Sequence, residues 1–229
     1  MNESKVEMTR EEIAAELRHG TRVILQVRHA ERPKMDPDDP TFGDSLPITA
    51  EGIRTARAFG ESFKEFRDVQ FYASPLRRTR MTAEEIAAGM GITNPIIPTD
   101  GLLGNESFYY NDALQVLDVF KPDNFFRASF EYFATGHQRG FNEVHEATEA
   151  LEEWLLAHQT KQLFIATTHD LYIAAFLSAK GTIPVFSKEN WPRFLDAAAI
   201  LIDKDGTRRY ALLRSNLSTG ICGIGPKGA

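Results

Sequence analysis

Short apolar runs alternate along this chain with longer segments that carry the signals of helix starts and ends. Runs rich in β-branched and apolar residues predict strands, and the segments between them predict helices. The predicted strands are residues 21–27, 69–73 and 162–168, with a weaker one between Pro95 and Pro98. This alternation is typical of an α/β fold, and we expect a three-layer α/β/α sandwich around a mainly parallel sheet.

Capping residues and glycines mark the predicted helix ends. Thr9 and Glu12 form a capping-box pattern that starts a helix, which Gly20 can end. Ser74 followed by Pro75 predicts a cap with proline at the first helical position. The other helices are expected from Thr49 to about Phe66, from Ser74 to about Met90, and over about 141–158 and 170–179.

Residues 101–140 interrupt the alternation and are crowded with Phe and Tyr. We expect helical pieces there but no clean β-α unit, and we interpret the segment as an insertion that packs over one end of the sheet. Clustered aromatic side chains most often form a satellite hydrophobic core. Contact with a substrate is the alternative, and both hold if the inner edge of the cap reaches the site.

The remaining segments complete a single domain over residues 1–229. Pro33 to Pro47 is rich in proline and aspartate and predicts a loop. Lys204-Asp205-Gly206 predicts a hairpin between 198–203 and 207–213, which would add antiparallel strands to the sheet. The glycine-rich tail at 215–229 is expected to be irregular.

Composition narrows the setting in which the chain works. The net charge of −6 makes a general nucleic-acid or acidic-membrane surface unexpected. Cys222 is the single cysteine, which is consistent with a reducing compartment. The first residues lack the apolar core of a signal peptide, and no stretch approaches the roughly 20 apolar residues of a membrane span. We therefore expect a cytoplasmic protein with no membrane partner; the sequence leaves the oligomeric state open.

Two histidines each follow a predicted strand directly. Arg28-His29-Ala30-Glu31-Arg32 follows the first strand, and His169-Asp170 follows the strand at 162–168. Because the carboxyl ends of parallel strands meet at one crevice, we expect both histidines to lie there. A neutral imidazole is a competent nucleophile near neutral pH, and guanidinium groups fit phosphate oxygens. This combination predicts a phosphoryl-transfer site.

The neighbouring residues suggest the remaining roles. Arg28 and Arg32 flank His29 and are expected to keep it deprotonated, and a third arginine comes from Arg77-Arg78 at a helix start. His169 would add a donor to the phosphate oxygens. Asp170 either supplies a proton to the leaving oxygen or caps the helix that begins there, and the two roles are compatible.

Four motifs in order resemble the histidine phosphatase superfamily, the family of phosphoglycerate mutases and histidine acid phosphatases. They are Arg28-His29-Ala30-Glu31-Arg32, Leu46-Pro47-Ile48-Thr49-Ala50-Glu51-Gly52, the segment from Ser74 to Ala83, and Thr168-His169-Asp170. The resemblance covers residues 22–90 and 160–180 but neither the insertion nor the tail. Ala30 stands where the family more commonly has glycine.

The resemblance implies a role for each matching residue. His29 resembles the family's phosphohistidine nucleophile, and His169 its second histidine. The phosphate-binding arginines correspond to Arg28, Arg32 and Arg78. The His-Asp pair resembles that of the acid phosphatase branch, in which the aspartate donates the proton, although this chain lacks that branch's size, secretion signal and disulfides. Glu106 is the alternative donor, in the manner of the mutases.

These residues predict a metal-independent phosphomonoesterase that acts through a phosphohistidine on a small phosphorylated metabolite or on protein phosphohistidine. A mutase-like phosphotransferase is the alternative, and a non-catalytic protein that binds a phospho-ligand is the third hypothesis. No cofactor is expected. No metal is expected either, because the remaining histidines show no ligand-like spacing. They are His19, His137, His145 and His158.

Overall fold

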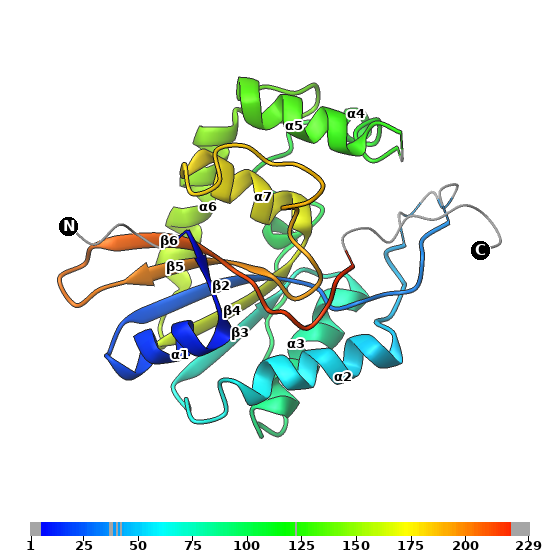
Figure 1. Cartoon of the computed structure of the whole chain (residues 1–229). Helices are drawn as coiled ribbons and strands as arrows, with labels where there is room; N and C mark the ends of the chain where they lie inside the picture. Colours follow the sequence, from blue (N-terminus) through cyan, green and yellow to red (C-terminus); the bar gives the residue numbers. More distant parts are fainter. Residues whose placement is uncertain (1–5, 37–38, 40, 42, 122, 221–229) are drawn as a thin grey trace.

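A six-stranded sheet forms the centre of the protein, with helices on both faces (Figure 1). The structure is a computed structural model and describes residues 6–36, 39, 41, 43–121 and 123–220. The strand order is β1-β6-β5-β2-β4-β3. The strands are β1 (Glu7–Met8), β2 (Arg22–Arg28), β3 (Val69–Ala73), β4 (Leu163–Thr168), β5 (Ala197–Ile202) and β6 (Arg208–Leu213).

Most of the sheet is parallel, as the sequence predicts. Strands β2, β4 and β3 run parallel to one another, and β5 is antiparallel to both of its neighbours, β2 and β6. The hairpin between β5 and β6 is therefore confirmed. The short strand β1 was not predicted and pairs in parallel with β6 at the edge of the sheet.

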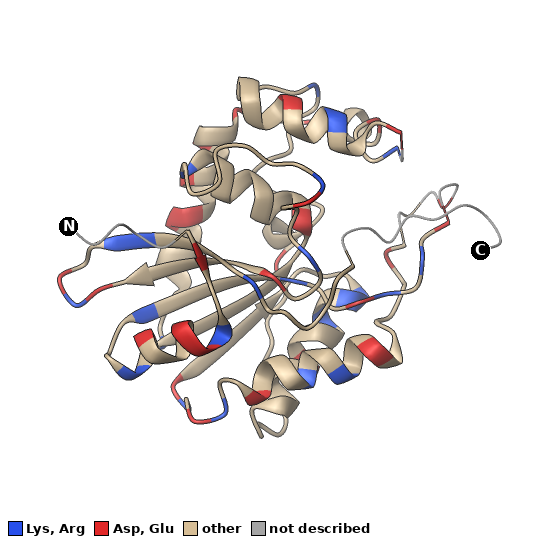
Figure 2. Ribbon diagram, viewed as in Figure 1, with Lys and Arg blue, Asp and Glu red and all other residues tan. Residues whose placement is uncertain are grey.

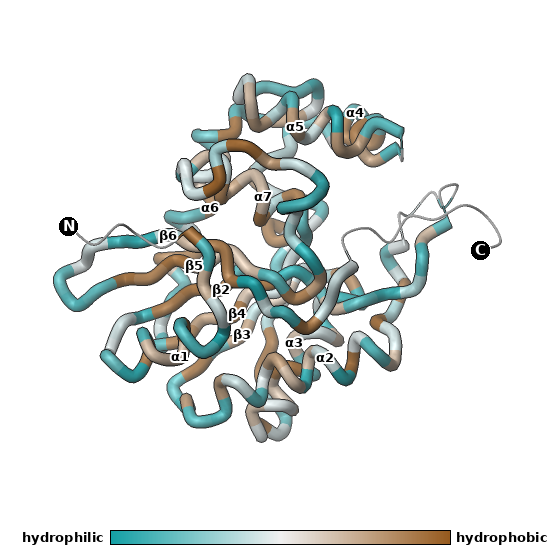
Figure 3. The backbone as a smooth tube through the Cα atoms, in the orientation of Figure 1, coloured by the Kyte–Doolittle hydropathy of each residue, from teal (hydrophilic) through white to brown (hydrophobic). Residues whose placement is uncertain are grey.

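The two faces of the sheet have separate hydrophobic cores. Val23 and Leu25 of β2 pack with the helices α1, α2 and α3, whereas Ile24 between them packs with α6 and α7 on the opposite face. Figure 3 shows hydrophobic strands at the centre, and Figure 2 shows charges of both signs on the outer helices. The helices are α1 (Arg10–Arg18), α2 (Ala50–Glu61), α3 (Arg77–Gly89), α6 (Val144–His158) and α7 (Asp170–Ala179).

The start of α3 differs from the prediction. The helix begins at Arg77 with Leu76 as its N-cap and no side-chain cap, so Ser74-Pro75 does not start it. The reason is that Ser74 lies directly after β3, where its hydroxyl is within hydrogen-bond distance of Thr79 and His169. The serine therefore belongs to the end of the sheet rather than to the helix.

Two further boundaries also differ. Helix α2 ends at Glu61 instead of about Phe66, because the backbone there changes to i→i+3 hydrogen bonds such as that from Phe63 N to the Gly60 carbonyl. Residues 95–98 form no strand. Prolines at both ends of that segment lack an N–H to donate, and a single bridge between Ala73 and Thr99 is formed.

The aromatic insertion lies outside α6 and α7 in Figure 1. It contains a 3₁₀ turn (Gly101–Leu103) and the helices α4 (Ala113–Val116) and α5 (Phe125–Thr135). Its aromatic residues join the core that covers the α7 face of the sheet, so they extend one of the two main cores instead of forming a separate satellite core. Residues 215–220 form no helix or strand, and the rest of the tail, with Cys222, lies outside the described residues.

No helix among the described residues has the length and apolar character needed to cross a membrane.

Candidate functional site

The register of the sheet places the two predicted histidines side by side. Arg28, the last residue of β2, pairs with Thr168, the last residue of β4, so the residue after each strand is a histidine. The ring centroids of His29 and His169 are 5.5 Å apart, and His29 N donates a hydrogen bond to the Thr168 carbonyl at 3.0 Å. Two segments 140 positions apart therefore meet at one edge of the sheet, as predicted.

One hydrogen bond fixes the tautomer of His29. Its Nδ1 lies 2.8 Å from the carbonyl oxygen of Ala30. Because a carbonyl can only accept, Nδ1 carries the proton and Nε2 keeps its lone pair in the neutral ring. The side chain is 4% exposed. This is the form in which an imidazole acts as a nucleophile.

The starts of α2 and α3, which contain the second and third sequence motifs, hold the loop after His29. Ala30 N donates to Thr82 Oγ1 on α3 at 2.9 Å, and the Glu31 carbonyl accepts from Thr49 N at 2.8 Å. A Cβ atom at Gly52 would come within 2.3 Å of that same carbonyl oxygen. Glycine at this position therefore allows α2 to approach the loop closely.

Arg28 is buried and has fixed partners. Its Nη1 donates to the Pro192 carbonyl at 2.6 Å, and its Nη2 lies 3.0 Å from Asp170 Oδ2. The guanidinium carbon also lies 4.4 Å from the centre of the Phe194 ring. The guanidinium is thus oriented before any ligand binds.

Asp170 is the first residue of α7, after His169 as N-cap. Its Oδ1 accepts from Leu171 N at 3.0 Å, and its Oδ2 accepts from the indole Nε1 of Trp191, also at 3.0 Å. The carboxylate is half-buried beside Arg28. Asp170 is the first helical residue and not the N-cap, yet its carboxylate accepts from a first-turn backbone N–H, so the helix-start role and the proton transfer stay compatible.

Arg78, rather than Arg77, lies in the site. It is 7% exposed, and its Nη1 donates to the Gly43 carbonyl at 2.8 Å, whereas Arg77 is exposed. Among the described residues its buried Nε has no hydrogen-bond partner. Burial, together with the charge of Arg32, lowers its pKa to about 10, which leaves it protonated at neutral pH.

His169 is held by the end of the neighbouring strand. Ser74 Oγ lies 3.2 Å from His169 Nε2 and 2.7 Å from Thr79 Oγ1. The ring also meets Tyr172 edge-on at 5.6 Å. Three strand ends, those of β2, β3 and β4, therefore contribute to the same cluster.

Both histidines are neutral at pH 7. Burial lowers the pKa of His29 well below its ordinary value, and the charges of Arg78, His169 and Arg28 lower it further. Burial also lowers the pKa of His169, and the charges of Arg78, Arg28 and Arg32 lower it further. The charge of Arg32 lowers the pKa of His169 and of Arg78.

A family model of the histidine phosphatase superfamily, branch 1, matches residues 24–202. The chain belongs to the histidine phosphatase superfamily. The matched region includes the two histidines and the three arginines carried over from the sequence motifs. A comparison with curated proteins gives no match.

Solved structures share this fold at low sequence identity. YhfR of Bacillus stearothermophilus is 19% identical, with a TM-score of 0.56 and coverage of 86% of this chain and 99% of that chain. A mycobacterial glucosyl-3-phosphoglycerate phosphatase solved with vanadate is 17% identical, with a TM-score of 0.53 and coverage of 83% and 97%. A phosphoglycerate mutase from Bacillus anthracis is 13% identical, with a TM-score of 0.54 and coverage of 85% and 92%.

Glu106, the alternative proton donor, lies on a loop beside the histidine phosphatase site. The loop is attached through the Leu103 carbonyl, which accepts from Thr168 Oγ1, and the Gly104 carbonyl, which accepts from Tyr172 OH, both at 2.8 Å. Glu106 itself is exposed, and its carboxylate makes no hydrogen bond or ion pair with another described residue. Asp170 and Glu106 thus both remain candidates for the proton donor.

Sequence reasoning missed the segment that orients Arg28. Trp191, Pro192 and Phe194 all contact Arg28 or its partner Asp170, yet they belong to no motif and no predicted element. Ser74 was read as a helix cap, although its place directly after a predicted strand was a signal for the site.

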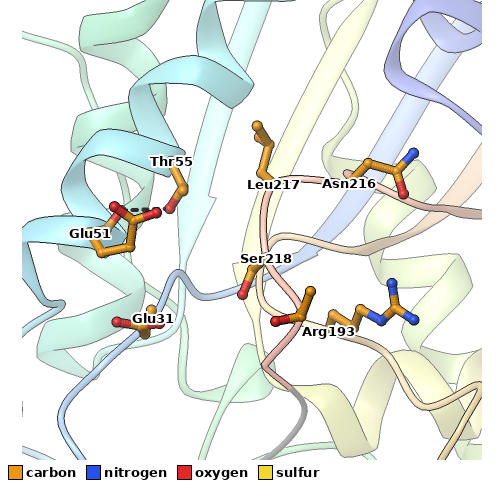
Figure 4. Close-up of a pocket in the computed structure, with 8 residues that line it drawn as sticks. Glu31, Glu51, Thr55, Arg193, Asn216, Leu217 and Ser218 are labelled. Atoms are coloured by element: carbon orange, nitrogen blue, oxygen red, sulfur yellow. Dashed lines mark hydrogen bonds between the residues drawn. The ribbon is translucent and has the colours of Figure 1, made fainter.

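A cavity of about 380 Å³ has Glu31 in its lining, and none of His29, His169 and Arg78 lines it (Figure 4). Glu31 lies two residues after His29, and Arg193 precedes Phe194, whose ring lies 5.6 Å from that of His29. Figure 4 shows Glu31, Glu51 and Thr55 facing the segment that carries Asn216 and Ser218. The lining residues are Glu31, Glu51, Thr55, Arg193, Asn216, Leu217, Ser218 and Thr219.

Within the part of the chain that the structure describes, no group of three or more His, Cys, Asp or Glu side chains is placed to hold a metal ion. Metal-independent chemistry stays a prediction from the sequence.

Proposed function

We propose that the protein is a phosphomonoester hydrolase that acts through a phosphohistidine at His29. The observation that carries the proposal is the hydrogen bond from His29 Nδ1 to the Ala30 carbonyl, which leaves the Nε2 lone pair available. Membership of the histidine phosphatase superfamily and the buried arginines Arg28 and Arg78 support it. Phosphoryl transfer requires positive charge around the oxygens of the transferring group.

In the first step, His29 Nε2 attacks phosphorus while the bond from phosphorus to the leaving oxygen breaks. Asp170 gives that oxygen a proton, so that it leaves as a neutral alcohol. Arg28, Arg32, Arg78 and His169 bind the phosphoryl oxygens in this reaction. In the second step, water attacks phosphorus, Asp170 accepts the proton of the water, and the bond from phosphorus to nitrogen breaks to release phosphate.

The source of the proton follows from the contacts of Asp170. Without substrate its Oδ2 accepts from Arg28 and Trp191, so it holds no proton to give at that oxygen. A phosphomonoester has a second pKa of about 6 and binds in part as its monoanion. We infer that such a substrate brings the proton, which Asp170 relays to the leaving oxygen once the phosphate has replaced its carboxylate at Arg28.

The substrate class we propose is a small phosphorylated metabolite. The cavity that Glu31 lines, of about 380 Å³, lies within the size range of small-molecule pockets, roughly 300–1,000 Å³. Carboxylate and hydroxyl side chains line it, which suits a hydroxyl-bearing leaving group. A mutase instead has to keep water from the phosphohistidine.

The test is turnover of p-nitrophenyl phosphate and of alkyl phosphates by the wild type and by His29→Ala. We expect His29→Ala to abolish turnover, and phosphohistidine to be trapped at His29 of the wild type by rapid quenching. His145→Ala is the matched control, since His145 is exposed. Full turnover by His29→Ala would contradict the mechanism. Transfer of phosphate between positions of phosphoglycerate, with negligible hydrolysis, would establish the mutase alternative.

A further inference from the structure

We propose that Trp191 is a positioning residue of this site, whose indole N–H holds Asp170 in place against Arg28. The kinetic part of this inference rests on the proposed hydrolase function, whereas the hydrogen bond from Trp191 to Asp170 can be tested without it. Trp191 lies outside every motif that the sequence offers.

One carboxylate oxygen joins the three residues. Asp170 Oδ2 lies 3.0 Å from Trp191 Nε1 and 3.0 Å from Arg28 Nη2. Trp191 is fully buried and Arg28 is 3% exposed. Because both of these partners are buried, the indole N–H and the guanidinium fix the direction of Oδ2, and a hydrogen bond to a charged group in such surroundings is a strong one.

The segment that carries Trp191 holds Arg28 from three directions. Trp191 acts through Asp170, the Pro192 carbonyl accepts from Arg28 Nη1 at 2.6 Å, and the Phe194 ring lies 4.4 Å from the guanidinium carbon. Arg214 anchors the segment, since its Nη1 donates to the Trp191 carbonyl at 3.2 Å and to Asp196 Oδ2 at 2.8 Å. The position of the indole is therefore fixed by its backbone as well as by its ring.

Phenylalanine rings, most of them from α5, surround the indole. Their centroids lie 5.2–6.2 Å from that of Trp191, and the rings are Phe125, Phe126, Phe130, Phe133 and Phe186. Such close packing leaves the indole no room to turn its N–H away from Asp170. The aromatic insertion therefore does more than extend the core on the α7 face of the sheet, because it determines where the carboxylate of Asp170 points.

The first experiment is NMR of the indole N–H groups in ¹⁵N-labelled Trp154→Phe. The chain has two tryptophans, so the remaining indole signal belongs to Trp191. We expect a slowly exchanging indole proton that shifts when inorganic phosphate is added and again when Asp170→Asn is introduced. An indole signal that responds to neither change would overturn the proposal, whatever the catalytic activity of the protein.

The second experiment is a double-mutant cycle of Trp191→Phe and Asp170→Asn. Trp191→Phe keeps an aromatic ring and removes the N–H. Loss of a hydrogen bond to a charged group corresponds to a fall in kcat of about 10-fold or more, with a smaller change in KM. If Trp191 acts through Asp170, Trp191→Phe should lower kcat only slightly in the Asp170→Asn background.

Trp154→Phe is the matched control for this cycle. Trp154 lies on α6 and contacts Tyr72 and His158 away from the site. The kcat of Trp154→Phe should therefore match that of the wild type. An equal fall in kcat in both backgrounds would show that Trp191 only supports the fold, and the proposal would be wrong. Absence of phosphatase activity in the wild type would instead refute the proposed function, and the NMR result alone would then decide the inference.

Discussion

Arg28 Nη2 lies 3.0 Å from Asp170 Oδ2 in an ion pair whose side chains are 4% and 19% exposed. The pair links the end of β2 to the start of α7, and His29 and His169 are the residues next to these two ends. In the proposed mechanism a phosphate would compete with Asp170 for the same guanidinium. The ion pair would then keep Arg28 in a defined orientation until a substrate replaces the carboxylate.

Replacing Arg28 by lysine should lower kcat for p-nitrophenyl phosphate by about 10²-fold, the size of effect seen when one donor to a transition state is lost. Lysine keeps the charge but lacks the planar fork that reaches both Pro192 O and Asp170. Steady-state kinetics measure the effect. Arg77→Lys is the control and should behave as the wild type, because Arg77 is exposed.

Asp170→Asn and Glu106→Gln distinguish the two candidate proton donors. p-Nitrophenolate leaves without a proton, whereas an alkoxide needs one, so loss of the donor should lower turnover of an alkyl phosphate about 10²-fold more than that of p-nitrophenyl phosphate. We expect this difference for Asp170→Asn and not for Glu106→Gln. The reverse result would assign the proton transfer to Glu106.

Ser74→Ala should lower kcat/KM by about 10-fold, through a higher KM and a lower kcat. The Ser74 hydroxyl lies 3.2 Å from His169 Nε2, and its loss leaves a buried ring nitrogen without that partner, at a cost of about 1–3 kcal/mol. Kinetics and thermal unfolding measured together test this prediction. Ser178→Ala, near the far end of α7, is the control, and an equal effect there would refute a specific role for Ser74.

The two buried histidines should make folding stability depend on pH. Their pKa values are lowered in the folded protein, so below about pH 6.5 the unfolded chain binds protons that the folded chain does not. The free energy of unfolding therefore falls as the pH is lowered from 7.5, by up to about 1.4 kcal/mol per pH unit for each histidine. His29→Gln should show a shallower decline in chemical denaturation between pH 7.5 and 5.

His145→Gln provides the comparison for that experiment. His145 is exposed, so its replacement should leave the pH dependence of the wild type unchanged. If His29→Gln and His145→Gln gave the same slope, the lowered pKa of His29 in the folded protein would be refuted.

Local patterns were sufficient wherever a structure depends on neighbours in the sequence. The capping box of Thr9 and Glu12, the strands β2, β3 and β4, and the hairpin at Lys204-Asp205-Gly206 were all predicted. Failures came where a distant contact outweighed a local preference. The serine-proline pair at Ser74 has the form of a helix start, but the hydroxyl is used at the end of the sheet beside His169.

The sequence by itself determined the α/β fold, the family, and the meeting of His29 with His169, because residues that follow parallel strands must converge at one edge of the sheet. Only the tertiary structure decided what surrounds them. The partners of Arg28 lie 142 and 164 positions away, at Asp170 and Pro192, and the indole that holds Asp170 comes from a segment without any pattern. Such contacts depend on how separate elements pack together, which local propensity does not encode.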